Sequence, residues 1–467
     1  MSTRWYAADW LLFEGELREG WGLEVSEDGH VSSAQPGSPP SATHFRNCVL
    51  LPGLVNAHSH AFQRLLRGRT EFLQPGQGSD DFWSWRELMY QAAAVLDPEQ
   101  LYVASRHAFL EMALAGITSV GEFHYLHRDP TGASYADPNE LAKQVIRAAR
   151  DVGLRIVLLR VAYERGAYRT PPNPVQRRFV DPSPGAFLSA FDALRDDLRG
   201  ESAVSIGVAP HSIRAVSKEW LEEIQRQWKG VIHMHVAEQL REVKACLEEH
   251  GKRPVELLDE IGLLGPDFTA VHALHLSRDE ISELGLSGAS VCVCPTTEKN
   301  LGDGVVQADL LAAAKIPLCV GSDSQAQVDL LAEARDLEGH LRLLRGRRAV
   351  LDPGTGRPDG LARQLFTTAT LHGAHALGLP TGELRTGTPA DFFTVDLSHP
   401  SMSGAVPTNL LAFIVFAAEK GAIRDVAVNG ELIVREGRHS LAERSTVEFA
   451  KLSRQLSTQM PYSSSPD

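Results

Sequence analysis

Eight short apolar runs, rich in β-branched residues, alternate with stretches of helical periodicity along the middle of the chain. This alternation is typical of parallel α/β folds, because neighbouring parallel strands need a crossover, usually a helix, between them. Eight runs are the number that a (β/α)8 barrel of the TIM type requires. We expect strands at 49–55, 117–123, 155–161, 204–208, 231–236, 269–273, 290–294 and 316–321, with helices between them, for example at 100–114, 140–152 and 218–228.

The two ends of the chain have a different pattern. Short alternating segments, separated by Gly, Pro and Ser, occupy residues 4–48. Similar segments recur at 391–396 and 426–435, and Asn429-Gly430 predicts a hairpin turn within the second of these. Both ends are therefore expected to form β structure outside the barrel.

Composition excludes several classes of protein. The chain has 467 residues, of which 43% are hydrophobic and 22% charged, as is usual for a globular protein with a large core. Its net charge of −13 argues against nucleic acid or an anionic membrane as a partner. No apolar run approaches the roughly 18–20 residues of a membrane span, and we expect no signal peptide. The five cysteines are few and odd in number, so we expect reduced thiols and a cytoplasmic protein.

The first expected strand leads into His58 and His60. Side chains at i and i+2 of a strand point to the same face, so the two imidazoles should converge while Ser59 turns away. Such a pair can supply two ligands of a zinc site, but by itself it is equally compatible with histidines bonded to backbone at a loop edge. The interpretation depends on what the later strand ends supply.

Later expected strands carry further imidazoles and a carboxylate near their carboxyl ends, where barrel enzymes place their chemistry. His233 and His235 lie on the fifth strand, His272 on the sixth, and Asp323 follows the eighth. Any one of these alone would most simply be structural, for example an Asp that caps a helix. Together they predict a metal site, and a His, His, His, Asp set suits zinc, although iron(II) or another divalent ion is also compatible.

The chain resembles the amidohydrolase superfamily, in particular its deaminase-like branch, over nearly its whole length. The matching motifs, in order, are Pro52-Gly-Leu-Val-Asn-Ala-His-Ser-His60, His235-Val-Ala-Glu238, His272, Cys294-Pro295 with Asn300-Leu-Gly302, Gly321-Ser-Asp323 and Gly387-Thr-Pro-Ala-Asp391. Together with the strand pattern, this resemblance leads us to expect a small β-sandwich domain from residues 1–49 and 385–440, a catalytic barrel at 50–384, and a C-terminal helix with a polar tail at 441–467.

The resemblance also implies roles for the strand-end residues. His58, His60, His235 and Asp323 would bind one metal ion per chain, which we expect to be Zn²⁺. Glu238 and His272 would be catalytic beside it. His233 shares a strand face with His235, and it is the family position that favours His235. The binuclear branch of the superfamily has a carboxylated lysine at the end of strand four, whereas the segment 208–214 contains no lysine, which favours a single metal ion.

These residue types suit hydrolysis of a carbon–nitrogen double bond. Zinc can lower the pKa of a bound water to roughly 7, which provides hydroxide at neutral pH. Asp323 could take the proton as the hydroxide attacks, and Glu238 could protonate the departing amine. His272 could hold or polarise the nucleophile. The products would be a carbonyl compound and ammonia.

Three arginines follow strand ends or lie in loops expected near the mouth of the barrel, namely Arg64, Arg86 and Arg214. Each one could simply be solvated or paired with a surface carboxylate. Together, in an acidic protein, they favour an anionic substrate, because arginine binds carboxylates bidentately. This suits a small dicarboxylate better than a nucleobase.

More specific segments resemble the formimidoylglutamate deiminases, a family of histidine breakdown that converts N-formimino-L-glutamate and water to N-formyl-L-glutamate and ammonia. The resemblance implies that Gln63, Arg86, Tyr125, His211 and Arg214 contact the glutamate portion, with Gln325 nearby, and that a homodimer is possible. The segments are His58-Ser-His-Ala-Phe-Gln-Arg64, Phe82-Trp-Ser-Trp-Arg-Glu-Leu-Met-Tyr90, Glu122-Phe-His-Tyr125, His211-Ser-Ile-Arg214 and Gly321-Ser-Asp-Ser-Gln325.

Two alternatives remain open. A deaminase of the same branch that acts on a guanine- or adenosine-like base would need amide or aromatic groups to read a ring edge, and would have less use for Arg86 and Arg214. A metal-free barrel kept for assembly or regulation would show damage at one or more of the expected ligands or catalytic residues, and all of them are present.

Overall fold

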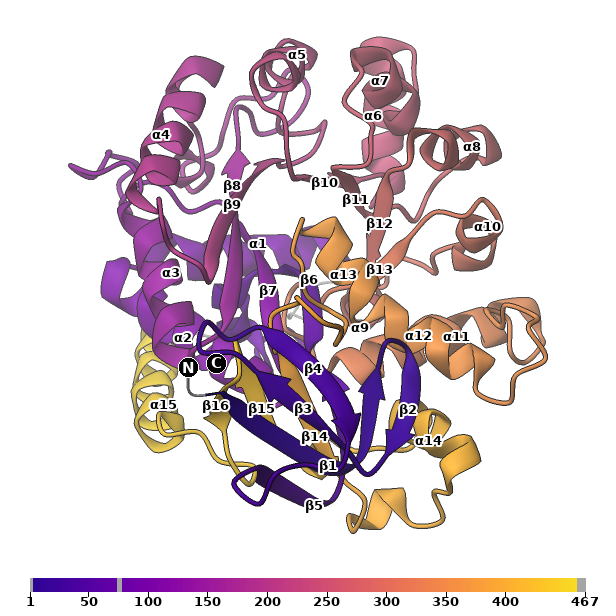
Figure 1. Ribbon diagram of the computed structural model, residues 1–467. Coiled ribbons are helices and arrows are strands. Elements are labelled where there is room, and N and C mark those ends of the chain that lie inside the picture. The colour runs from indigo at the N-terminus through magenta and orange to yellow at the C-terminus, as the bar shows by residue number, and fades with distance from the viewer. Residues whose placement is uncertain (1–2, 74–77, 460–467) are drawn as a thin grey trace.

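The computed structural model describes residues 3–73 and 78–459 and contains the expected barrel, which is confirmed. Its eight parallel strands are hydrogen-bonded in chain order from β6 to β13, with helices around them (Figure 1). A parallel bridge between Ser59 and Asp323 joins the two ends of this sheet. The strands are β6 (Leu54–Ser59), β7 (Ile117–His124), β8 (Arg155–Ala162), β9 (Val204–Pro210), β10 (Ile232–Val236), β11 (Phe268–His272), β12 (Ser290–Val293) and β13 (Leu318–Val320).

The expected first strand, 49–55, is wrong as one element. It contains the end of β5 (Thr43–Pro52), which belongs to a second sheet, and the start of β6. Gly53 separates the two strands, and a Cβ atom there would lie 2.1 Å from Oγ1 of Thr118. The continuous apolar run hides this break because both strands are buried. The other seven expected runs overlap β7 to β13.

The helices begin and end at recognisable signals. Asp97 caps α2 in a capping box with Gln100, and Pro98 is the first helical residue. Gly153, with φ of 85°, ends α3 in the left-handed conformation. Around the barrel and beyond it lie α1 (Phe82–Val95), α2 (Pro98–Ala113), α3 (Glu140–Val152), α4 (Pro184–Asp197), α5 (Lys218–Gln227), α6 (Leu240–His250), α7 (Pro254–Ile261), α8 (Arg278–Ser287), α9 (Pro295–Leu301), α10 (Ala308–Ala313), α11 (Leu330–Arg345), α12 (Gly360–Thr368), α13 (Leu371–Ala376), α14 (Leu410–Phe416) and α15 (Ala442–Gln459).

A second, mostly antiparallel sheet combines both ends of the chain, as expected. Its order is β16-β15-β14-β5-β1-β3-β4, with β2 paired to β1, and antiparallel pairing of β14 with β5 joins the two chain ends. Asn429 and Gly430 have φ of 49° and 66° and form the predicted hairpin turn between β15 and β16. The remaining strands are β1 (Arg4–Phe13), β2 (Glu16–Glu19), β3 (Trp21–Val25), β4 (Val31–Pro36), β14 (Phe392–Asp396), β15 (Ile423–Val428) and β16 (Glu431–Val434).

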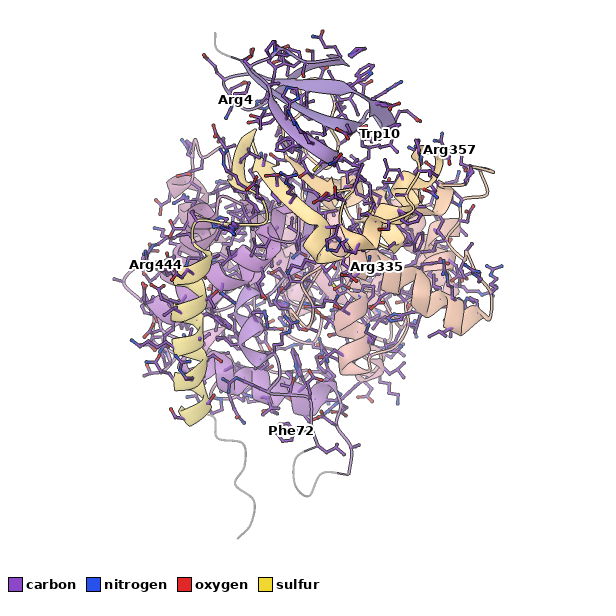
Figure 2. The ribbon with its side chains drawn as sticks, turned by 90° about the horizontal axis from the view of Figure 1, so that it is seen from below. Arg4, Trp10, Phe72, Arg335, Arg357 and Arg444 are labelled. Atoms are coloured by element: carbon purple, nitrogen blue, oxygen red, sulfur yellow. The ribbon has the colours of Figure 1, made fainter. Side chains whose placement is uncertain are left out.

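The second sheet contacts the amino-terminal end of the barrel. Arg155, the first residue of β8, forms a buried ion pair with Asp391 just before β14, with Nε 3.1 Å from Oδ2. The second sheet therefore does not cover the carboxyl ends of the barrel strands, which is where barrel enzymes have their active sites. In Figure 2, Phe72 lies at the side of the molecule away from Arg4 and Trp10 of β1.

The chain segments group into recognisable units. We propose that the second sheet and the barrel form separate domains, with the first boundary at Gly53 rather than at residue 49, because β5 extends to Pro52. Helix α15 lies in the segment expected to be helical, and the polar tail expected after it is outside the described residues.

All five cysteines are buried and free. Among the described residues, every helix is too short or too polar to cross a membrane.

Candidate active site and metal centre

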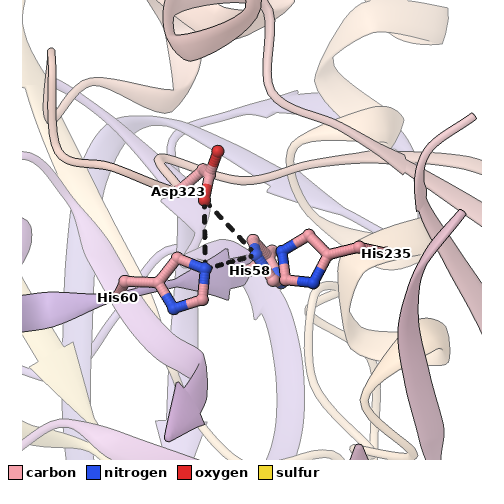
Figure 3. Close-up of side chains that lie close together, drawn as sticks. All are labelled: His58, His60, His235 and Asp323. Carbon is pink, nitrogen blue, oxygen red and sulfur yellow. Dashed lines mark hydrogen bonds and ion pairs between the residues drawn. The ribbon is translucent and has the colours of Figure 1, made fainter. Parts of the chain in front are cut away.

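Four side chains from three strand ends converge at the carboxyl end of the barrel (Figure 3). Oδ1 of Asp323 lies 3.4 Å from Nε2 of His58 and 3.3 Å from Nε2 of His60, and these two nitrogens are 3.2 Å apart. His235 of β10 completes the group, in which one possible ligand atom of each residue lies within 4.8 Å of all the others. The structure thus brings together the four residues that were expected to hold a metal ion.

Closure of the barrel brings the two histidines of β6 and its end next to Asp323. The backbone N–H of His60 donates to the carbonyl of Asp323 at 2.9 Å, and the N–H of Asp323 donates to the carbonyl of His58 at 3.0 Å. Gly321 allows this approach, since a Cβ atom there would lie 2.6 Å from the carbonyl oxygen of His58. Residues more than 260 positions apart therefore meet because β13 is adjacent to β6.

The protonation of the histidines fits a cation at the centre of the group. Nδ1 of His60 donates to the carbonyl of Phe123 at 2.9 Å, and Nδ1 of His235 donates to the carbonyl of His211 at 3.0 Å. Their Nε2 atoms therefore carry lone pairs, as metal-binding histidines with a backbone partner do. Burial lowers the pKa of His58 to about 3 and that of His235 well below its usual value, so both imidazoles are neutral.

The remaining donor is a carboxylate. Burial tends to raise the pKa of Asp323, but the neighbouring His58, His272 and His60 hold it below its usual value, so the group is ionised. Three neutral imidazoles and one carboxylate, with lone pairs directed at one another over little more than 3 Å, fit a divalent metal ion.

The structure also separates His233 from His235. Nε2 of His233 is 2.8 Å from the carbonyl of Ala376 in α13, and the side chain is fully buried outside the metal group. Side chains two apart on a barrel strand face the same way but occupy successive interior layers. Only His235 is in the layer that meets Asp323.

His272 and Glu238 lie beside the metal group, as expected for catalytic residues. Nε2 of His272 is 3.7 Å from Oε1 of Glu238 and 3.8 Å from Oδ2 of Asp323. Although burial lowers it, the pKa of His272 is raised to about 10 by the surrounding carboxylates. Ala237, His272 and Asp323 have φ of 50°, 69° and 44°, a left-handed conformation that costs energy for residues other than glycine and clusters at functional sites.

A cavity of about 60 Å³ opens onto this group. Within it, Nε2 of Gln63 donates to the hydroxyl of Tyr125 at 2.9 Å, while the buried Oε1 of Gln63 has no partner among the described residues and can accept from a ligand. Burial raises the pKa of Tyr125 and lowers that of His211, so both are neutral. Five of the six residues expected to contact the substrate line the cavity, namely Gln63, Arg86, Tyr125, His211 and Arg214.

The arginines differ in how they are paired. Arg214 lies between two buried carboxylates, with Nη2 2.8 Å from Oε2 of Glu238 and Nε 3.0 Å from Oε2 of Glu242. Arg86 stacks on the rings of Trp83 and Tyr90 at 4.6 and 5.2 Å, and its carboxylate contact, to the exposed Glu87, is at 3.7 Å. Of these two arginines, Arg86 therefore has more N–H groups available to donate to a ligand.

Two expected residues lie elsewhere. Gln325 is fully buried and does not line the cavity; its Nε2 donates to Oγ of Ser59 and its Oε1 accepts from Oγ of Ser322, each at 2.9 Å. Direct contact of Gln325 with a substrate does not fit this placement. Arg64 is paired with Glu111, with Nη2 2.8 Å from Oε1, and is absent from the cavity lining.

Sequence reasoning missed most of the aromatic wall of the cavity. Phe82, Trp85, Met89 and Tyr90 of α1 line it, together with Tyr163 and Phe179. The spacing of i, i+3, i+7 and i+8 along α1 is that of one helix face and could have identified the first four. Nothing local identifies Tyr163 and Phe179, because they reach the cavity from separate segments.

The chain matches the amidohydrolase family model over residues 49–433. It is 37% identical, over 93% of its length and 96% of the relative's, to the formimidoylglutamate deiminase of Pseudomonas aeruginosa. It is 30% identical, over 96% of its length and 100% of the relative's, to the 8-oxoguanine deaminase of the same organism.

Solved structures share the whole architecture. A crystal structure of an amidohydrolase from Brucella melitensis superimposes with a TM-score of 0.89 at 35% identity, covering 97% of this chain and 99% of the other. An adenosine deaminase from Xanthomonas campestris gives a TM-score of 0.80 at 23% identity, covering 97% and 98%, and supports the fold alone. With the family model matched over most of the chain and two relatives at or above 30% identity, the chain belongs to the amidohydrolase family.

Proposed function

We propose that this protein hydrolyses N-formimino-L-glutamate to N-formyl-L-glutamate and ammonia. The observation that carries the proposal is Arg86, a guanidinium with spare donors in a largely aromatic cavity that opens onto the His58, His60, His235 and Asp323 group. A substrate carboxylate is a suitable partner for such a cation. The similarity to the formimidoylglutamate deiminase of P. aeruginosa supports the same assignment.

The metal ion in this proposal is one zinc ion per chain, held by His58, His60, His235 and Asp323. When bound, it supplies the Lewis acidity that activates water near neutral pH. We assign to the side chain of Asp323 the acceptance of a proton from the attacking water, because this carboxylate is ionised and lies at the metal group beside His272.

Glu238 and His272 handle the leaving nitrogen and the nucleophile. Oε1 of Glu238 faces Nε2 of His272 at 3.7 Å, and Oε2 accepts from Arg214. We assign to Glu238 the transfer of a proton to the departing nitrogen, and to His272 the orientation of the attacking oxygen. Water adds to the formimino carbon, the carbon–nitrogen bond to the terminal nitrogen breaks, and the products are the formyl amide and ammonia.

The glutamate portion of the substrate would contact the outer part of the cavity. We assign its carboxylates to Arg86 and Arg214, the arginines that line the cavity, and an N–H of the substrate to the unpaired Oε1 of Gln63. Tyr125 and His211 are neutral donors or acceptors on the same wall. This small dicarboxylate is the finer part of the proposal, and a homodimer is a further prediction that light scattering tests.

The test is ammonia release by the zinc-loaded, full-length protein, with N-formimino-L-glutamate, 8-oxoguanine, guanine and adenosine measured in parallel. The proposal predicts turnover of the formimino compound with little turnover of the purines. The 30% identity to an 8-oxoguanine deaminase makes a purine the second candidate. Turnover of a purine without turnover of the formimino compound would overturn the substrate assignment but not the family.

A further inference from the structure

The two ring nitrogens of His272 face opposite surroundings. Nε2 is directed at Glu238 and Asp323, at 3.7 and 3.8 Å, on the cavity side. Nδ1 is directed away from the cavity, at a carboxylate oxygen of Glu298 3.2 Å distant. An ionised carboxylate can only accept a hydrogen bond, so Nδ1 is protonated and donates to Glu298, and this bond sets the orientation of the ring.

Glu298 is held rigidly by its own helix. It is the fourth residue of α9, is 1% exposed, and the same Oε1 atom accepts from the backbone N–H of Cys294 at 2.8 Å. Within the part of the chain that the structure describes, its ion pair is with His272 and not with a lysine or arginine. A buried carboxylate fixed by backbone and left without another cation directs its charge at the imidazole.

We propose that Glu298 is a positioning residue for the reaction: its bond to Nδ1 fixes the rotation of the His272 ring, so that Nε2 faces Glu238 and Asp323. The catalytic role of His272 rests on the function proposed above, whereas the bond that fixes its ring does not. Without Glu298 the imidazole can turn about its side-chain bonds, and a displacement of this kind at a reacting group can cost about 10²-fold in rate.

The chain offers a matched control at the same helix. Glu333 of α11 is also fully buried and also accepts from a backbone N–H at the start of α9, that of Thr296 at 2.8 Å. The hydroxyl of Thr296 donates to it as well. Both glutamates therefore stabilise the first turn of α9, but only Glu298 contacts His272. If activity were lost only because α9 loosens, replacement of either glutamate by alanine would lower it.

The experiment compares Glu298→Ala, Glu298→Gln and Glu333→Ala in the full-length, zinc-loaded protein. Ammonia release from N-formimino-L-glutamate gives kcat and KM, and metal analysis gives the zinc content. Removal of the group that orients a histidine at a metal site typically costs about 10–100-fold, so we expect a kcat loss of this size in Glu298→Ala, with KM and zinc content close to wild type. Glu298→Gln, which keeps an oxygen acceptor, should recover most of kcat, and Glu333→Ala should retain it.

A second readout does not depend on activity. In protein labelled with ¹⁵N-histidine, the Nδ1 proton of His272 should give a strongly downfield resonance, assigned by its loss in His272→Asn. The resonance should be absent in Glu298→Ala and present in Glu333→Ala. Three results would each overturn the positioning role: the resonance is present in Glu298→Ala, the kcat losses of Glu298→Ala and Glu333→Ala are equal, or the kcat loss of Glu298→Ala is matched by a loss of zinc. A wild-type protein inactive on the formimino compound would refute the proposed function, while the resonance would still test the bond.

Discussion

Replacement of Arg86 by methionine tests the substrate assignment most directly. The guanidinium lies in the cavity with Nε unpartnered among the described residues, so it can give a substrate carboxylate two charge-assisted hydrogen bonds. Such bonds contribute about 1.5–3 kcal/mol each, and we take about 3–4 kcal/mol for the pair. Since each 1.36 kcal/mol is tenfold in rate, kcat/KM for N-formimino-L-glutamate should fall by about 10²–10³-fold.

The same variant should remain folded. The ion pair of Arg86 with the exposed Glu87 at 3.7 Å contributes little, and stacking on Trp83 and Tyr90 is worth about 1 kcal/mol. Arg241 provides the control, because its guanidinium also stacks on Trp83, at 4.7 Å, but it lines a neighbouring cavity and not the one that opens onto the metal group. Arg241→Met should therefore keep kcat/KM near wild type.

Formamidine separates binding of the carboxylate from effects on the chemistry. It carries the reacting carbon–nitrogen double bond but no carboxylate, so its slow hydrolysis should be the same in wild type and in Arg86→Met. The assay is ammonia release at several concentrations of each substrate. Equal losses on both substrates, or wild-type kcat/KM on N-formimino-L-glutamate in Arg86→Met, would refute the reasoning.

Three further predictions concern stability and the metal site. Arg214→Met leaves Glu242 without its cation and should lower the free energy of unfolding by about 3–5 kcal/mol, measured with urea at pH 8. The loss should be smaller at pH 6, because burial, opposed by Arg214, raises the pKa of Glu242 to about 7 and a proton can then replace the guanidinium; a loss independent of pH would contradict this account. Gly321→Ala places a Cβ 2.6 Å from the carbonyl of His58 and should weaken zinc binding by about 10–100-fold in a chelator titration, whereas Gly339→Ala, which meets no atom within 4 Å, should not. Zinc at about 100 times its Kd should stabilise the fold by about 2.7 kcal/mol, so a chelator should lower Tm and added zinc restore it; an unchanged Tm would contradict a metal site that joins three strands.

Much of the fold was predictable because its signals are local. Seven barrel strands and the helices α2, α3 and α5 follow from periodicities within a few turns of chain, and the hairpin at Asn429-Gly430 follows from the conformations that those two residues tolerate. The division of 49–55 between two sheets was missed, since two buried strands in succession read as one apolar run, and the need for glycine at position 53 comes from Thr118, distant in sequence.

The candidate site divides in the same way. The sequence by itself determined the residue types at each strand end: imidazoles at 58, 60, 233, 235 and 272 and a carboxylate at 323. The tertiary structure gave the physical reason why His235, which the family position favoured, meets Asp323 while His233 does not. It alone decided that Gln325 bonds to Ser59 and that Arg214 is paired with buried carboxylates while Arg86 has only the exposed Glu87 as its carboxylate contact. The physical reason is that periodicity fixes the direction of a side chain relative to its own strand, whereas its partners depend on which strands become neighbours when the barrel closes.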